Sequence, residues 1–141
     1  MRTAHILGRM EAISRAAESA KPHLLRKGTV PIDLGCGTAF FAEAVEIRSI
    51  VGLDFSSVFL PFARERMKTV FHQSIFDFQL KKSSVDNIIS LFVIDDHPSE
   101  KKRIFFKHVL SSLKPSGRFF FSACSPNDER MGKLREVVNK K

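Results

Sequence analysis

The stretch that decides the fold is VPIDLGCGTAFFAEAV, residues Val30 to Val45. An apolar run reaches Asp33 and then enters a turn bracketed by Gly35 and Gly37. A strand-to-helix turn needs glycine where φ is positive or where a ligand touches the backbone. The third glycine of the dinucleotide motif G-x-G-x-x-G would fall on Phe40, which disfavours a nicotinamide cofactor, and no P-loop sequence occurs in the chain.

Segments typical of strands and of helices alternate along the chain. Apolar runs predict strands at residues 29–34, 49–55, 69–75, 84–94 and 118–124, with amphipathic segments between them. This alternation predicts a doubly wound α/β fold: a mostly parallel sheet of about five strands with helices on both faces. In such folds a ligand binds at the carboxyl ends of the strands where the strand order reverses, and we expect the glycine turn there.

We expect a single domain of three segments. Residues 1–28 form an N-terminal helix that ends near Pro22, residues 29–125 form a cofactor-binding core, and residues 126–141 form a C-terminal helix. The inner face of this last helix would carry Met131, Leu134 and Val138. The fifth strand would then be an edge of the sheet, which invites pairing with a second copy or a partner chain.

Charge, cysteine content and the length of the apolar runs limit the partners, the compartment and the membrane association that we expect. The formal charge of +8 favours anionic partners, but Lys and Arg are scattered along the 141 residues, so nucleic acid is only an alternative partner. Cys36 and Cys124 have neither metal-ligand spacing nor a disulfide framework, which fits a reducing compartment. No apolar run approaches the roughly 18 residues of a membrane span. We expect a cytoplasmic protein without a metal.

Two carboxylates follow the first two predicted strands. Asp33 precedes the glycine turn, where it would repel a diphosphate but suit a ligand that carries positive charge. Asp54 ends the second strand, where a carboxylate can accept hydrogen bonds from both hydroxyls of a ribose. Together they suggest a nucleoside with a cationic appendage, a description that S-adenosylmethionine fits.

Four segments resemble the successive motifs of the class I, Rossmann-like, S-adenosylmethionine-dependent methyltransferases, most nearly the small type 11 group. They are IDLGCGTAFFAEAV, IVGLDFSSVFLPFARERM, HQSIFDFQLKKSSVDNIISLFVIDD and VLSSLKPSGRFFFSACSP, in the order of the family. The resemblance implies S-adenosyl-L-methionine as cofactor, S-adenosyl-L-homocysteine as product, and a first helix that covers the acceptor as a lid. The family continues past the fifth strand into an antiparallel strand pair, so this chain resembles a member truncated after that strand.

The resemblance also implies roles for individual residues. The cofactor-binding positions are Asp33, Gly35, Cys36, Gly37, Asp54, Phe55, Ser74, Ile75 and Phe92. Ser74 stands where the family has an Asp that reads the adenine, and nearby Asp77 is the alternative reader. Ala39 replaces the third glycine of the family's turn, which adds one methyl group near the cofactor.

The segment IDDHP, residues 94–98, follows the most apolar strand and supplies the candidate catalytic residues. Asp95, Asp96 and His97 form an acid–base cluster placed to face an acceptor, and His97 could remove a proton from a hydroxyl or an amine. Alternatively, the segment is a polar loop that caps the next helix.

We therefore predict methyl transfer from S-adenosylmethionine to a small-molecule or anionic acceptor. The transfer is an in-line displacement at an activated sulfonium, so alignment of donor and acceptor is the main task of the protein. Two alternatives stay open. One is a reduced, non-catalytic relative that acts as a binding partner or subunit. The other is an RNA-directed methyltransferase, whose Lys and Arg would converge around the mouth of the site.

Overall fold

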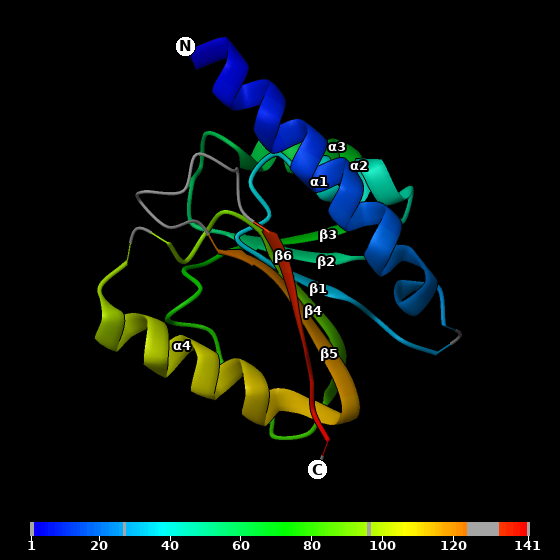
Figure 1. Ribbon diagram of the computed structural model, residues 1–141, viewed down its shortest axis with the longest axis vertical. Coiled ribbons are helices and arrows are strands. Elements are labelled where there is room, and N and C mark those ends of the chain that lie inside the picture. Colours follow the sequence, from blue (N-terminus) through cyan, green and yellow to red (C-terminus); the bar gives the residue numbers. More distant parts are fainter. Residues whose placement is uncertain (1, 27, 96, 124–132, 141) are drawn as a thin grey trace.

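The computed structural model describes residues 2–26, 28–95, 97–123 and 133–140. Helices and strands alternate along most of the chain (Figure 1). The elements are α1 (Arg2–Leu24), β1 (Ile32–Leu34), α2 (Phe40–Val45), β2 (Val51–Asp54), α3 (Leu60–Arg66), β3 (Thr69–His72), β4 (Val85–Ser90), α4 (Ser99–Ser112), β5 (Leu113–Ala123) and β6 (Lys133–Val138).

The strands form one sheet of six in the order β3-β2-β1-β4-β5-β6. The first five are mutually parallel and β6 runs antiparallel to β5. After β1 the chain moves outward through β2 to β3, and it then crosses back to place β4 on the other side of β1. The predicted doubly wound α/β fold is confirmed, and the strand order reverses between β1 and β4, beside the glycine turn.

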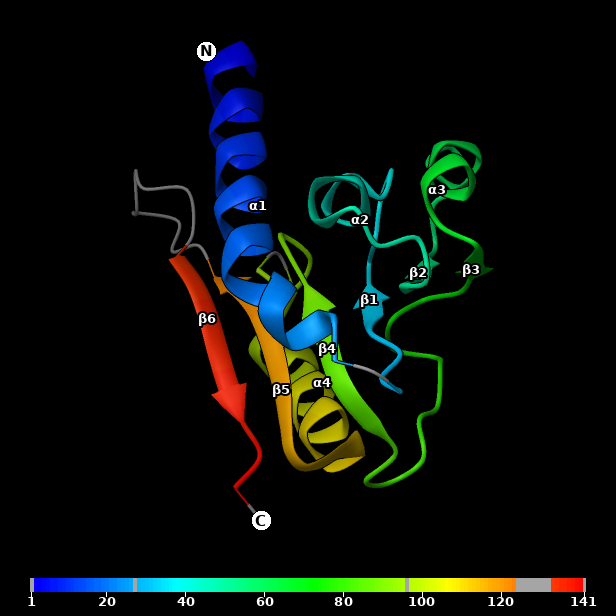
Figure 2. The same cartoon turned by 90° about the vertical axis from the view of Figure 1, so that its right-hand side faces the viewer.

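Helices cover both faces of the sheet, as Figures 1 and 2 show, with α1, α2 and α3 on one face and α4 on the other. On the first face, small buried residues of α1 (Ala16, Ala17 and Ala20) let this helix pack closely against α2 and the sheet. The second face is built on phenylalanine. The rings of Phe105, Phe106, Phe119 and Phe121 lie between 4.9 and 6.2 Å apart, at distances that suit edge-to-face and stacked pairs.

The first helix is longer than predicted. It continues through Pro22 to Leu24 instead of ending before the proline. Pro22 is exposed in the last turn, where a missing N–H removes a single helical hydrogen bond. Leu24 is buried in the first core cluster, and this contact holds the final turn against the sheet.

The prediction of a C-terminal helix over residues 126–141 is wrong where the structure describes this segment. Lys133–Val138 is strand β6, paired with β5 from Ala123 back to Arg118. The free backbone groups of β5 offer this segment a partner, and the adjacent β-branched residues Val137 and Val138 favour a strand. One antiparallel strand is therefore present, and β5 is not an edge of the sheet. Met131 lies outside the described residues.

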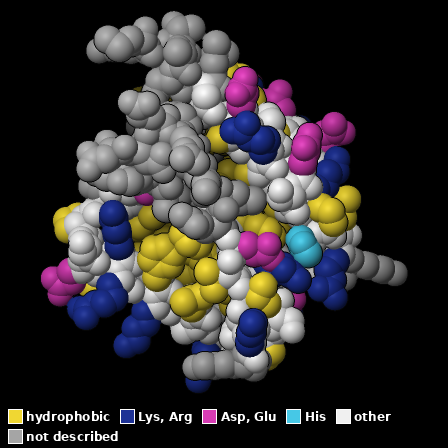
Figure 3. Space-filling model, viewed as in Figure 1, with side chains coloured by type: hydrophobic (Ala, Val, Ile, Leu, Met, Phe, Trp, Pro, Cys, Tyr) yellow, Lys and Arg dark blue, Asp and Glu magenta, His cyan; other side chains and the backbone are white. Residues whose placement is uncertain are grey.

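The face of the sheet that α4 covers keeps some apolar surface. Phe106, Phe121 and Val137 pack against the second core cluster but stay only partly buried. Figure 3 shows hydrophobic side chains at the surface in the region of α4 and the neighbouring strands. Among the described residues, no helix combines the length and the apolar content that crossing a bilayer requires.

Candidate functional site

A cavity of about 680 Å³ opens at the carboxyl ends of β1, β2 and β4. This volume lies within the range of about 300–1,000 Å³ that is usual for small-molecule sites. The cavity brings together all nine predicted cofactor positions. Asp33, Gly35, Cys36 and Gly37 come from the end of β1, Asp54 and Phe55 from the end of β2, Ser74 and Ile75 from the segment after β3, and Phe92 from the segment after β4.

The turn after β1 is fixed by hydrogen bonds to β2 and to Asp54. The backbone N–H groups of Gly35 and Cys36 both donate to the carbonyl of Leu53, at 2.7 and 3.0 Å. The N–H of Gly37 donates to Oδ2 of Asp54 at 2.8 Å, and the N–H of Ser56 donates to Oδ1 at 2.8 Å. The Asp54 carboxylate thus holds two loops together, and each of its oxygens keeps a lone pair for a further donor.

The two glycines of the turn serve different purposes. Both have positive φ, +77° at Gly35 and +57° at Gly37. A Cβ at Gly35 would lie 2.4 Å from Cγ2 of Val93, whereas a Cβ at Gly37 would meet nothing within 4 Å. Gly35 therefore permits close packing of the segment after β4, and Gly37 leaves open space in the cavity wall. Ala39 also has positive φ, +65°, although it carries a side chain.

Asp33 is a buried carboxylate at the cavity wall, with only 3% of its surface exposed. Burial first, and then the nearby Asp54, raise the pKa of Asp33 from 3.8 to about 7. No hydrogen bond among the described residues offsets these two effects on the pKa of Asp33. A carboxylate in this position gains most from a cationic ligand, because a positive charge offsets both the desolvation and the repulsion by Asp54.

Cys36 lies between the two glycines and is buried. Burial raises the pKa of its thiol far above the ordinary value, and Asp33 and Asp54 add to this shift. Because the thiolate is the reactive form, Cys36 is a packed small residue and not a nucleophile. Cys124 lies outside the described residues.

The predicted acid–base cluster is only partly placed at the cavity. His97 lines the cavity and meets the ring of Phe76 edge-on, with the ring centroids 4.8 Å apart. Asp95 is partly buried and is not part of the cavity wall. Asp96 lies outside the described residues. Of the three candidates, the structure thus brings His97 alone to the cavity within the part of the chain that it describes.

The sequence did not predict the cationic wall of the cavity, which consists of Arg9 and Lys101. Arg9 reaches the cavity from α1, together with the apolar Ile13, and Lys101 reaches it from the first turn of α4. The guanidinium of Arg9 lies 5.2 Å from the ring centroid of Phe92, and Nζ of Lys101 lies 5.2 Å from that of Phe76. The sequence does contain one indication of this wall: Arg9 and Ile13 are four residues apart, so they lie on the same face of a helix.

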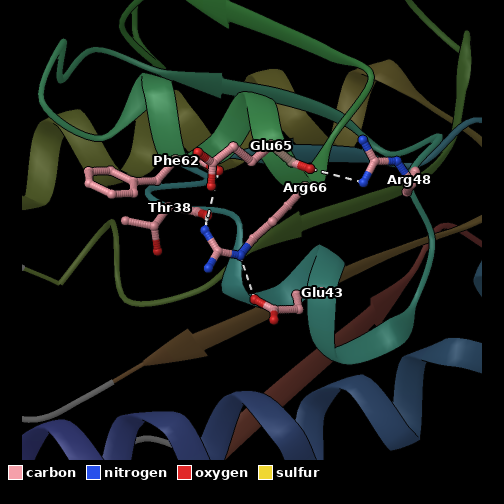
Figure 4. A network of polar contacts seen from close by, with 6 residues as sticks. All are labelled: Thr38, Glu43, Arg48, Phe62, Glu65 and Arg66. Carbon is pink, nitrogen blue, oxygen red and sulfur yellow. Dashed lines mark hydrogen bonds and ion pairs between the residues drawn. The ribbon is translucent and has the colours of Figure 1, made fainter.

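A polar network ties α3 to the glycine turn (Figure 4). The side chain of Arg66 extends from α3, forms an ion pair with Glu43 of α2, and donates to the carbonyl of Thr38 at 3.3 Å. Arg48 donates to the carbonyl of Glu65 at 2.9 Å. The network joins the two helices that flank the cavity on this face.

We expect Arg66→Met to lower the free energy of unfolding by only about 1 kcal/mol. The loss is small because the ion pair with Glu43 is largely solvated, and exposed ion pairs contribute little to stability. Urea unfolding measures this loss. Glu43→Gln is the control that removes the ion pair alone, and its loss should be the smaller of the two. A urea midpoint for Arg66→Met equal to that of the wild type would show that the network does not brace the turn.

Among the described residues, no three His, Cys, Asp or Glu side chains gather as metal ligands would.

Comparison with known proteins points to one family. A family model described as a methyltransferase domain matches residues 25–141. No sequence among curated proteins matches the chain significantly.

Several solved structures are similar. A SAM-dependent methyltransferase from Archaeoglobus fulgidus superposes with a TM-score of 0.70 at 18% identity, covering 84% of this chain and 55% of that one. A magnesium protoporphyrin IX methyltransferase from Synechocystis, solved with bound SAM, gives 0.67 at 18% identity, covering 85% and 61%. An S-adenosylmethionine-dependent methyltransferase from Mesorhizobium loti gives 0.61 at 24% identity, covering 89% and 65%. The chain thus spans about half to two thirds of the length of these three proteins.

Proposed function

This chain belongs to the methyltransferase-domain family, and from that premise we propose that it transfers a methyl group from S-adenosylmethionine to an acceptor. The observation that carries the proposal is the pair of carboxylates in the cavity: Asp33, whose pKa is raised by burial and by Asp54, and Asp54 at the end of β2. This pair suits a nucleoside that carries positive charge.

Features of the cavity fit such a cofactor. Phe55 is 74% exposed at the cavity wall, an unfavourable position for a large apolar residue unless a flat base covers it. Gly37 leaves open space where a side chain would stand. Asp54 keeps acceptor capacity for ribose hydroxyls. When bound, S-adenosylmethionine supplies a methyl group already activated by its sulfonium.

The residues of the chain then have distinct tasks. Asp54 and the segment from Ser74 to Ile75 would hold the nucleoside, and Asp33 would pair with the cationic end. Their positions at the ends of neighbouring strands fix them relative to one another, and alignment of donor and acceptor lowers the entropic part of the activation barrier to such a transfer. His97 would remove a proton where the acceptor is a hydroxyl or an ammonium.

Two further expectations stay predictions. One is a cytoplasmic location. The other is association with a second copy or a partner chain through a sheet edge, which would now involve β3 or β6 because β5 is paired on both sides.

A melting experiment tests the proposal. S-adenosylhomocysteine at about 100 times its dissociation constant should stabilise the wild type by about 2.7 kcal/mol, a shift of several degrees. The shift should disappear in Asp54→Ala, which loses the ribose acceptor. Asp86→Ala, on β4 and away from the cavity, is the matched control and should keep the shift.

Because Asp54 also holds two backbone N–H groups, its replacement can lower the melting temperature by itself. Titration calorimetry on Asp54→Asn, at a temperature where circular dichroism shows a folded protein, separates lost binding from lost stability. A wild type with neither a melting shift nor a heat of binding would contradict the proposal. Binding without transfer to any acceptor would favour the non-catalytic relative, and transfer to RNA the RNA-directed enzyme.

A further inference from the structure

We propose that the methyl acceptor carries an oxyanion, a carboxylate or a phosphate, that Arg9 and Lys101 bind at the cavity wall. This inference rests on the proposed function and names the chemistry of its acceptor. Three observations carry it: the separation of charge across the cavity, the lack of a carboxylate partner for either cation among the described residues, and the positions of both cations relative to the glycine turn and His97.

Charge is divided across the cavity. Its carboxylates are Asp33, next to the last residue of β1, and Asp54, the last residue of β2. The Lys and Arg side chains that line it, Lys101 and Arg9, come from α4 and α1. A ligand that fills the cavity therefore meets negative charge on one wall and positive charge on another. A nucleoside with a cationic end matches the first wall, and the second wall is left for a group of opposite charge.

Neither cation has a carboxylate partner in the part of the chain that the structure describes. The ion pairs there involve Arg66, Lys114 and Arg118. Arg9 and Lys101 instead lie near the rings of Phe92 and Phe76. A ring contact of this kind positions a cation without using its N–H donors, and a guanidinium presents several donors in a planar fork that suits carboxylate and phosphate.

The position of Arg9 places it near the reacting end of the site. Phe92 directly precedes Val93, which packs on Gly35 of the turn. The end of β4 is held to β1 because the hydroxyl of Ser90 donates to the carbonyl of Leu34 at 2.9 Å. The segment that carries Arg9's ring partner is therefore beside the glycine turn. An anion on Arg9 would lie next to the end of the donor that Asp33 attracts.

Lys101 is placed by a second ring. Phe76 contacts both Nζ of Lys101 and the imidazole of His97. Lys101 also belongs to the first turn of α4, where the helix dipole adds positive potential. The candidate base and the second cation thus share one aromatic support, so an acceptor held by Lys101 would lie within reach of His97.

The experiment uses wild-type protein saturated with S-adenosylhomocysteine and titrated with small aromatic probes: benzoate, phenyl phosphate and neutral benzamide. We expect both anions to bind at least tenfold more tightly than benzamide. Arg9→Met and Lys101→Met should each weaken the anions about tenfold and leave benzamide unchanged. Arg15→Met on α1 and Lys107→Met on α4 are matched controls, because both residues are exposed and neither lines the cavity.

Two results would overturn the inference. In the first, the anions bind no better than benzamide, or the two cavity variants behave like their controls. In the second, Arg9→Met weakens S-adenosylhomocysteine but not 5′-methylthioadenosine, which lacks the amino-acid part. Arg9 would then serve the carboxylate of the donor and not the acceptor. Failure of the wild type to bind S-adenosylhomocysteine at all would instead contradict the proposed function.

Discussion

The variant Asp33→Asn is expected to be more stable than the wild type at pH 8, by about 4 kcal/mol. Asp33 has a pKa of about 7 in the folded protein and 3.8 as its ordinary value, with burial as the main cause. Above pH 7 the folded protein must hold this carboxylate ionised and buried. A shift of about three pKa units corresponds to about 4 kcal/mol. Asparagine keeps the size of the side chain and removes the charge.

The pH dependence of stability has a definite sign. Between pH 4 and pH 7 the unfolded chain has released the proton of Asp33 while the folded protein still holds it. The free energy of unfolding therefore falls as pH rises through this window, and it levels off above pH 7. Asp33→Asn should lack this contribution, so the difference between the two proteins grows from pH 4 to pH 7. Urea unfolding at several pH values measures it.

Asp77→Asn is the control for this prediction, since Asp77 is exposed and does not line the cavity. It should follow the wild type at every pH. Equal pH slopes for Asp33→Asn and the wild type would contradict the prediction. Ligand binding should respond in the opposite direction: the affinity of a cationic ligand such as S-adenosylmethionine should rise with pH up to about 7, where Asp33 ionises, and this rise should be absent in Asp33→Asn.

The second large effect is expected at the glycine turn, where Gly35→Ala and Gly37→Ala should fail in different ways. Gly35→Ala combines positive φ with a Cβ 2.4 Å from Val93, and we expect it to cost about 3 kcal/mol of unfolding free energy. Gly37→Ala carries only the φ penalty of about 1 kcal/mol, but its methyl group enters the cavity. Gly37→Ala should therefore stay folded and lose most of its affinity for S-adenosylhomocysteine.

The steric part of the Gly35 effect can be isolated. The double variant Gly35→Ala with Val93→Ala removes the clashing methyl groups and keeps the backbone strain. It should recover part of the stability that Gly35→Ala loses relative to Val93→Ala alone. Urea unfolding and calorimetric titration are measured on all four variants. The interpretation would be wrong if Gly37→Ala were less stable than Gly35→Ala, or if Gly37→Ala bound ligand as the wild type does.

The sequence predicted the first five strands, because each contains a short apolar run and a glycine turn marks the end of β1. It also predicted Asp33 and Asp54 as a pair, since motif order places both at the ends of neighbouring strands. It did not predict β6. Leu134 and Val138 are spaced as in a helix. The segment becomes a strand because it forms backbone hydrogen bonds with the side of β5 that β4 does not occupy. Pairing of this kind depends on tertiary contact, which local periodicity does not contain.

The cationic wall was missed for a similar reason. Arg9 lies 83 residues before Phe92, and their contact exists only because α1 packs beside the end of β4. The sequence also gave no indication that Asp54 would accept hydrogen bonds from the backbone of Gly37 and Ser56. The motif identifies Asp54 as a ligand-binding carboxylate. Its second role, to accept hydrogen bonds from the backbone, depends on how the loops after β1 and β2 meet.

That double task of Asp54 has a consequence for how fast a ligand enters and leaves. The glycine turn is already held to the end of β2 in the free protein, so its ordering entropy is lost during folding and not during binding. Association should then follow a single exponential whose rate is proportional to ligand concentration. The lifetime of the complex would be set by the contacts that the ligand itself makes, with no slow loop closure to trap it.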